Sequence, residues 1–225
     1  MRSIPRIHSN SSRTPPTPRT TIDLIRHGEP VGGPMYRGGG RDDPLSERGW
    51  AEMRHAVANT TTPWQYIFSS PLRRCAAFAQ TLGEERALPV TLDERLREIG
   101  FGSWEGKRAE ELLAQDPELL RRFYRDPLAN QPAGAEPPRT FVKRVGAVLE
   151  EILENHAGEH LLIVAHAGVI RAAVAHILDL PLHALFQIKV EYAHFTRLRY
   201  GDQRPPSLLF HGLPQLPETQ EDSPT

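Results

Sequence analysis

The chain has 225 residues, of which 39% are hydrophobic and 24% are charged, and its formal net charge is -1. This length suits one globular domain with a full core, and the balanced charge gives no support for nucleic-acid or membrane binding as the main activity. The single cysteine, Cys75, excludes an internal disulfide and a cysteine-rich zinc site, and no apolar run reaches the roughly 20 residues that span a bilayer.

The two ends of the chain differ in composition from the middle. Residues 1–20 are rich in Ser, Thr, Pro and Arg and contain no acidic residue. Residues 213–225 are rich in proline and acidic residues. Such segments have little apolar surface to bury, so we expect a disordered tail at each end. The sequence therefore predicts one domain over residues 21–212.

The first element after the tail is the stretch 21–29, TIDLIRHGE. Its short apolar run predicts a buried strand, which ends in Arg26, His27 and Gly28. A cation and an imidazole at this place point to the crevice at the carboxyl ends of strands, where open α/β sheets bind ligands. Glycine lets a ligand or the backbone approach closely. A strand with a solvated Arg–His pair is the simpler interpretation of this tripeptide alone.

The next polar group of residues stands at another strand-to-helix turn. A glycine-rich loop over 30–43 and a helix that begins after 43–46 lead to a predicted strand over 65–69. A second helix is expected to begin at Ser70 and Pro71, with Ser70 as its cap. The serines, the free backbone N–H groups and Arg73 and Arg74 form a candidate anion site. A capped helix with solvated arginines is the alternative.

Glu98 lies in the following loop, 96–106, after a short predicted strand over 89–92. The glutamate stands between apolar residues in a loop with several glycines. A solvated loop glutamate is the default interpretation of this segment alone. Trp104 is expected to pack at a corner and fix the loop.

Helices are predicted over 108–113, 118–124 and 140–155, with a proline-rich loop over 125–138. The longest of them carries apolar residues along one face. His156 and His160 have helical spacing but straddle the end of this helix. We expect both to be surface residues rather than metal ligands.

The stretch 160–171, HLLIVAHAGVIR, repeats the pattern of the first strand. An apolar run over 161–164 predicts a second buried strand, followed by His166, Gly168 and an apolar helix over 169–178. Each histidine alone is more often structural. Two core strands that both end in a histidine beside a glycine suggest one site at one edge of a sheet.

The last two elements, over 191–200 and 207–211, are predicted to be strands. The alternation of strands and helices along the chain predicts an α/β fold, a three-layer α/β/α sandwich with a mostly parallel central sheet.

Taken together, the segments resemble the histidine phosphatase superfamily, the phosphoglycerate mutase-like family, over about residues 21–200. The resemblance rests on five segments that occur in the order of the family, namely RHGE (26–29), SSPLRR (69–74), LRE (96–98), FGSWEG (101–106) and AHAG (165–168).

The resemblance implies a role for each candidate residue. His27 is expected to accept the phosphoryl group and form a phosphohistidine, and Glu98 to protonate the leaving oxygen and then activate water. Arg26 and Arg74 are expected to bind the phosphate oxygens through forked donors and to disfavour the protonated form of His27. His166 is expected to stabilise charge in the transition state.

The family register places Arg74 in the pocket and Arg73 outside it, and Gly28 is expected beside the substrate. No metal ion or other cofactor is expected, because arginines and histidines supply the positive charge.

The loop after the first strand departs from the family pattern. Many members carry Thr or Ser after the RHGE segment and an asparagine that contacts phosphate a few residues later. Here Pro30 follows the segment, and Gly33 stands near the asparagine position. We predict that Tyr36 and Arg37 in this loop bind substrate in its place, with Arg37 reaching the phosphate ester.

The resemblance implies a metal-independent phosphomonoesterase that acts on a small molecule. The stretch 26–53 is similar to bacterial α-ribazole-5'-phosphate phosphatases of cobalamin synthesis. A phosphoglycerate mutase or a sugar (bis)phosphatase is the alternative within the fold, and a non-catalytic protein that binds a phosphorylated ligand is the alternative of another class. Hydrolysis is favoured over mutase activity because the excursion over 121–138 is modest.

We expect no nucleic-acid or membrane partner. Without an export signal or a disulfide pair, we expect a cytoplasmic protein. The sequence does not indicate an oligomeric state.

Overall fold

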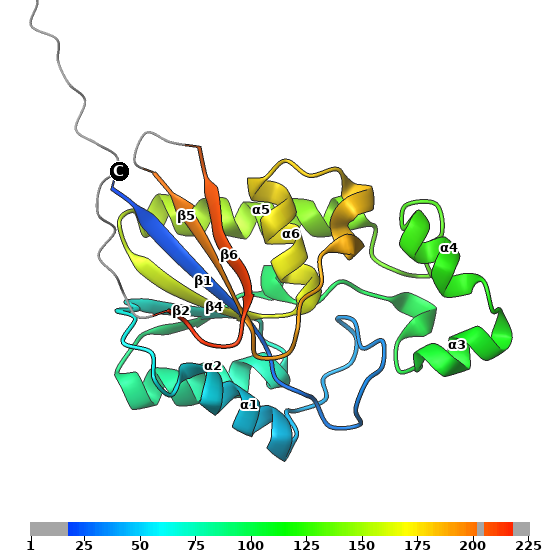
Figure 1. The fold of residues 1–225 in the computed structure, drawn as a ribbon, viewed down its shortest axis with the longest axis horizontal. Coiled ribbons are helices and arrows are strands. Elements are labelled where there is room, and N and C mark those ends of the chain that lie inside the picture. Colours follow the sequence, from blue (N-terminus) through cyan, green and yellow to red (C-terminus); the bar gives the residue numbers. More distant parts are fainter. Residues whose placement is uncertain (1–17, 202–204, 218–225) are drawn as a thin grey trace, which may run out of the picture.

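The computed structural model describes residues 18–201 and 205–217 and centres on one six-stranded sheet (Figure 1). The strand order is β3-β2-β4-β1-β5-β6. The first four of these strands run parallel, and β5 and β6 are antiparallel to their neighbours. The strands are β1 (Thr20–Arg26), β2 (Tyr66–Ser69), β3 (Val90–Leu92), β4 (His160–Ala165), β5 (Phe195–Tyr200) and β6 (Ser207–Leu213).

Helices cover both faces of the sheet, as Figure 1 shows: α1 and α2 lie on one side and α5 and α6 on the other, while α3 and α4 project away from the sheet. This arrangement confirms the predicted α/β fold with a mostly parallel sheet. The helices are α1 (Glu47–Val57), α2 (Arg73–Arg86), α3 (Ala109–Gln115), α4 (Leu119–Arg125), α5 (Pro138–Asn155) and α6 (Ala167–Ile177), with 3-10 turns η1 (Glu94–Leu96), η2 (Gly102–Trp104) and η3 (Leu182–Gln187).

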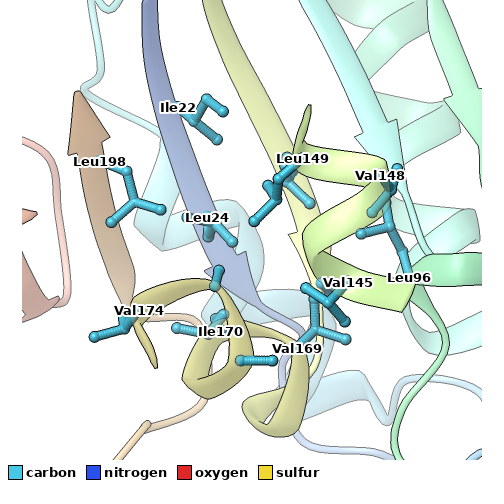
Figure 2. Close-up of a cluster of buried hydrophobic side chains, with 14 of the residues drawn as sticks. Ile22, Leu24, Leu96, Val145, Val148, Leu149, Val169, Ile170, Val174 and Leu198 are labelled. Carbon is cyan, nitrogen blue, oxygen red and sulfur yellow. The ribbon is translucent and has the colours of Figure 1, made fainter. Parts of the chain in front are cut away.

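The strand β1 is buried on both faces, which explains its apolar run. Successive side chains of a strand point to opposite faces. Ile22 and Leu24 therefore pack with α5 and α6, whereas Ile25 packs in the core that α1 and α2 cover. Figure 2 shows the first of these cores, with Val145 of α5 and Val169 of α6 beside the strand.

The register between β1 and β4 positions the functional site. The two strands are parallel, and Arg26 at the end of β1 is the partner of Ala165 at the end of β4. The next residue of each chain segment is a histidine, His27 or His166. The apolar patterns of two distant segments therefore bring both histidines to the same edge of the sheet.

A buried charge interrupts the apolar run of β1. Asp23 is fully buried and accepts hydrogen bonds from Arg197 Nε (2.7 Å) and Trp64 Nε1 (2.9 Å), and it pairs with His160 Nε2 at 2.9 Å. The prediction that His156 and His160 are surface residues is wrong. His156 is 19% exposed and packs against aromatic rings of β2, and His160 is 15% exposed because it completes the contacts of Asp23.

Two predicted element starts are also wrong. The helix expected at Ser70 begins at Arg73, with Leu72 at the cap position. The Ser70 hydroxyl accepts the backbone N–H of Leu72 (3.3 Å) and is also bonded to His166 Nε2 at 2.7 Å. The sequence pattern predicts the last strand pair from residue 191. Strand β5 begins at Phe195, because the preceding backbone turns at Ala193, whose φ is 53°.

The folded part of the chain extends beyond the predicted boundaries 21–212. Thr20 belongs to β1, Leu213 ends β6, and Leu216 packs against the core beside α1 and α2. The remaining parts of the expected tails, 1–17 and 218–225, lie outside the described residues. No helix in the described part of the chain is long and apolar enough to cross a membrane.

Candidate active site

The imidazole of His27 lies at the end of β1 and is buried. Its Nδ1 is 2.7 Å from the carbonyl oxygen of Gly28. Because a carbonyl oxygen only accepts, this contact assigns the ring proton to Nδ1 and leaves the lone pair on Nε2. Burial, followed by the charges of Arg74 and Arg26, holds the pKa of His27 well below its ordinary value. The ring is thus neutral at pH 7.

Gly28 lies behind His27 and does not line the cavity. A Cβ atom at this position would lie 2.2 Å from the carbonyl oxygen of Gly49 in α1. A glycine is therefore needed for the close packing of α1, and its carbonyl group orients the imidazole. The structure thus places Gly28 as a support for the His27 ring, whereas the sequence suggested a contact with substrate.

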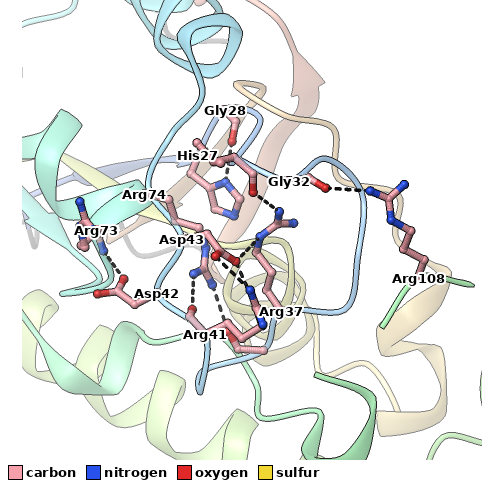
Figure 3. Close-up of polar contacts among 12 residues, drawn as sticks. His27, Gly28, Gly32, Arg37, Arg41, Asp42, Asp43, Arg73, Arg74 and Arg108 are labelled. Carbon is pink, nitrogen blue, oxygen red and sulfur yellow. Dashed lines mark hydrogen bonds and ion pairs between the residues drawn. The ribbon is translucent and has the colours of Figure 1, made fainter. Parts of the chain in front are cut away.

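Two guanidinium groups flank His27. Arg26 Nη1 donates to the carbonyl oxygen of Val190 (2.6 Å), and Arg74 donates to the carbonyl oxygens of Arg41 (2.8 Å) and Gly38 (3.0 Å) (Figure 3 shows Arg74 beside His27). The Nε atom of each arginine is buried and has no hydrogen-bond partner among the described residues. Since buried donors are normally satisfied, two such N–H groups suit an anion.

His166 follows β4 and is fully buried. Its ring centroid lies 5.1 Å from that of His27, with an interplanar angle of 67°. Burial and the charge of Arg74 hold the pKa of His166 well below its ordinary value. The contact with Ser70 Oγ fixes the ring orientation. The structure thus places a second neutral imidazole directly beside the first.

The carboxylate of Glu98 reaches the cavity from the loop after η1. It accepts the backbone N–H groups of Ile99 (2.9 Å) and of Gly168 (3.1 Å), the second residue of α6. A Cβ atom on Gly168 would lie 2.1 Å from Oε1 of the glutamate. The glycine after His166 therefore provides the space that the carboxylate occupies.

Tyr36 and Arg37 both line the cavity, where the sequence placed them. Arg37 is 6% exposed, donates from Nε to Asp43 Oδ2 (3.0 Å) and from Nη2 to the carbonyl oxygen of Val31 (2.6 Å), and its charge also acts to lower the pKa of His27. Tyr36 is bonded through its hydroxyl to that of Tyr124 at 2.9 Å. Arg73 is exposed and does not line the cavity, as the register predicted.

The cavity has a volume of about 170 Å³, and much of its wall is aromatic. Its aromatic lining residues are Tyr36, Phe101, Phe123, Tyr124, Phe186 and Tyr192. Arg171 is a further lining residue that the sequence pattern did not single out. Arg171 stands three residues after Gly168 on the same face of α6. Helical spacing could therefore have indicated its position from the sequence. Tyr192 and Phe186 had no such signal, because a turn and the 3-10 segment η3 bring them to the cavity.

The described segments contain no group of three or more His, Cys, Asp and Glu side chains that could hold a metal ion. The charges that face the cavity are those of the arginines and of Glu98. In this arrangement the arginines can hold a phosphate group beside an imidazole, and Glu98 can exchange a proton with the bound molecule.

Comparisons with known proteins agree with this geometry. The family model of the histidine phosphatase superfamily, branch 1, matches residues 22–211. The chain is 29% identical over 183 residues to phosphoserine phosphatase 1 of Hydrogenobacter thermophilus, covering 80% of this chain and 87% of that protein. It is 28% identical over 173 residues to the adenosylcobalamin/alpha-ribazole phosphatase of Escherichia coli, covering 75% of this chain and 84% of that protein.

Some relatives, at 31% identity, are longer, and the chain covers 49% of their length. Among solved structures, Bacillus stearothermophilus YhfR superimposes with a TM-score of 0.77 at 29% identity, covering 86% of this chain and 97% of that one. The chain is therefore an enzyme of the histidine phosphatase superfamily, branch 1.

Proposed function

We propose that this enzyme hydrolyses a small phosphate monoester through a phosphohistidine at His27, without a metal ion. One observation carries the proposal. The neutral ring of His27, with its lone pair on Nε2, lies beside the charges of Arg26 and Arg74, whose buried Nε–H groups have no partner among the described residues. A nucleophile and two fixed donors at one place supply the positioning and charge stabilisation that phosphoryl transfer requires.

In the first step, His27 Nε2 attacks phosphorus. An N–P bond forms, the bond from phosphorus to the ester oxygen breaks, and Glu98 gives its proton to the leaving oxygen. Arg26 and Arg74 hold the phosphate oxygens during the transfer. His166, beside the nucleophile, stabilises the charge of the transferring group.

In the second step, the carboxylate of Glu98 takes a proton from a water molecule that attacks the phosphohistidine. The N–P bond breaks, inorganic phosphate leaves, and His27 returns to its neutral form. Glu98 regains its proton in this step, so the cycle closes.

The proposal is tested by hydrolysis of p-nitrophenyl phosphate in the presence of EDTA. We expect full activity in the wild type, loss of it in His27→Ala, and no loss in His183→Ala, an exposed histidine outside the cavity. Abolition of activity by EDTA would contradict the metal-free route. Activity that survives in His27→Ala would contradict the role of that residue as nucleophile.

For the substrate we propose α-ribazole-5'-phosphate. The similarity of the stretch 26–53 to α-ribazole phosphatases and the name of the Escherichia coli relative support this choice. The aromatic lining of the cavity also supports it, because aromatic side chains pack well against a flat ring such as benzimidazole. Hydrolysis is proposed over mutase activity because the segment over 121–138 is short.

A small carboxylated ester such as phosphoserine is the second candidate, and Arg171 favours it. This guanidinium lines the cavity, and its described hydrogen-bond partner is the carbonyl oxygen of Ile188 (2.8 Å), which carries no charge. It could bind a substrate carboxylate.

A panel of α-ribazole-5'-phosphate, phosphoserine, 3-phosphoglycerate and a sugar phosphate separates the candidates by kcat/KM. Arg171→Leu is expected to reduce activity toward phosphoserine selectively if the carboxylated ester is the substrate. The proposal of α-ribazole-5'-phosphate is contradicted if another ester has the highest kcat/KM.

A further inference from the structure

One wall of the candidate phosphate site is an aromatic ring stacked on an arginine. The guanidinium carbon of Arg26 lies 3.8 Å from the centroid of the Tyr192 ring. The ring of Tyr192 lies 5.7 Å from that of His27, and its side chain lines the cavity. An arginine at this distance over an aromatic face is attracted to the negative potential of the ring. The ring is thus in direct contact with the guanidinium.

The backbone that carries Tyr192 is bonded to Arg26 on both sides. Arg26 Nη1 donates to the carbonyl oxygen of Val190 (2.6 Å), and the N–H of Ala193 donates to the carbonyl oxygen of Arg26 (3.0 Å). The N–H of Arg26 in turn donates to the carbonyl oxygen of His194 (3.3 Å). The segment 190–194 thus contacts both the side chain and the backbone of Arg26 at the end of β1.

The backbone of the segment 190–194 is strained at one residue. Ala193 has a φ of 53°, in the left-handed region that residues with a Cβ atom seldom adopt. Nδ1 of His194 lies 2.7 Å from the carbonyl oxygen of Tyr192 and supports this turn. Such conformations persist where the surrounding contacts enforce them. Here they turn the chain so that the Tyr192 ring lies against the guanidinium of Arg26.

We propose that Tyr192 is a positioning residue for the phosphate site, which it serves by fixing the plane of the Arg26 guanidinium. Nη1 of Arg26 already donates to the carbonyl oxygen of Val190. The Tyr192 ring prevents the guanidinium group from rotating out of its present plane. The buried Nε–H, which lacks a partner among the described residues, is thereby held for a phosphate oxygen. A planar donor group binds such oxygens through its edge, so its orientation decides the strength of the contact.

The proposal rests on the proposed phosphatase function. It also separates the ring of Tyr192 from its hydroxyl, because stacking needs only the aromatic face. Tyr192→Phe is expected to retain kcat/KM within about twofold, whereas Tyr192→Leu is expected to lose about 5- to 30-fold. Inhibition by inorganic phosphate is expected to weaken in Tyr192→Leu by a similar factor. Equal losses in both variants would show that the hydroxyl matters and would overturn the proposal.

A double-mutant cycle with Arg26→Gln shows whether Tyr192 acts through the arginine. If it does, Tyr192→Leu changes kcat/KM by less than about twofold once the guanidinium is absent, because two contacting residues do not act additively. If the ring instead contacts the leaving group directly, the two losses multiply, and the proposal is overturned.

Tyr66→Leu is the matched control. Tyr66 is also a partly buried tyrosine, stacked on Phe68 at 4.8 Å, but it does not line the cavity. This variant is expected to lower Tm and leave kcat/KM unchanged.

Calorimetric titration with inorganic phosphate distinguishes failure of this inference from failure of the proposed function. If the wild type hydrolyses no ester, the proposed function fails, and phosphate binding still tests the positioning role. Weaker phosphate binding in Tyr192→Leu than in the wild type and Tyr192→Phe supports it. Equal binding by all three proteins overturns it.

Discussion

Replacing Gly168 with alanine tests the placement of Glu98 without touching the carboxylate itself. The added methyl group would lie 2.1 Å from Oε1 and 3.1 Å from the carboxyl carbon of the glutamate, and 3.2 Å from Phe141 Cζ. Since ordinary contact begins at 3.4 Å, the carboxylate oxygen must move by at least about 1.3 Å. The clashing atom is the end of a flexible side chain, so the glutamate is expected to move while the fold is retained.

The loss expected from this movement is large. The displaced carboxylate loses its bond to the backbone N–H of residue 168, and misplacement of a catalytic group by about 1 Å can cost about 100-fold in rate. General acid–base catalysis contributes about 100- to 10,000-fold. We therefore expect kcat for an alkyl phosphate ester to fall by about 100-fold in Gly168→Ala. The free energy of unfolding is expected to change little, because alanine is favoured over glycine in a helix by up to about 1 kcal/mol.

Stopped-flow hydrolysis of p-nitrophenyl phosphate is the assay. Nitrophenolate needs little help in leaving, so phosphorylation of His27 is expected to survive in Gly168→Ala. Attack by water, for which we propose Glu98 as the base, is expected to become slow. The result should be a burst of about one nitrophenolate per active site, followed by slow turnover. Gly146→Ala in α5 is the control, because its added methyl group meets only the partly exposed ring of His176, at 3.1 Å. A folded Gly168→Ala protein with unchanged kcat and no burst would refute the assigned role of the carboxylate.

Buried charges and rings give three further predictions. The pKa values of His27 and His166 are lowered by folding, so the unfolded state binds more protons below about pH 6.5. The free energy of unfolding should therefore fall as the pH drops below this value, by up to about 1.4 kcal/mol per pH unit for each ring. Urea titrations at several pH values measure this dependence of the unfolding free energy on pH, and its slope should decrease in His27→Asn. Arg37→Ala is expected to lower kcat/KM by about tenfold or more through loss of a charged contact, and an unchanged value would remove this residue from the site. Asp23→Ala is expected to cost about 3–5 kcal/mol in denaturant unfolding, because it leaves Arg197 buried without its partner; a loss below about 1 kcal/mol would contradict this.

The sequence predicted the layers of the fold and the edge at which the polar residues gather, because both depend on local patterns. The apolar runs before His27 and His166 specify buried parallel strands, and parallel strands present their carboxyl ends at one edge. These local patterns are therefore enough to predict that the two histidines lie at the same edge of the sheet. The segments that carry Arg74 and Glu98 were identified as candidates from their positions at turns and loops and from the resemblance to a family.

Features that depend on a distant partner were not predictable in the same way. Ser70 has the local signature of a helix cap, but no local pattern predicts that its hydroxyl is also bonded to His166, 96 residues away, or that the helix begins only at Arg73. Asp23 and His160 come from different strands and stabilise each other in the core. The position of Tyr192 depends on a turn with a positive φ at an alanine, for which no local preference exists.

The central claim is that His27 carries the phosphoryl group between substrate and water. Its most direct test is rapid quenching of Glu98→Gln during turnover of p-nitrophenyl phosphate, followed by mass spectrometry of the peptides under basic conditions, in which phosphohistidine survives. We predict one phosphorylated peptide that contains His27, with the phosphoryl group on its imidazole. A label on another residue, or turnover in the wild type with no phosphorylated peptide in either protein, would contradict it.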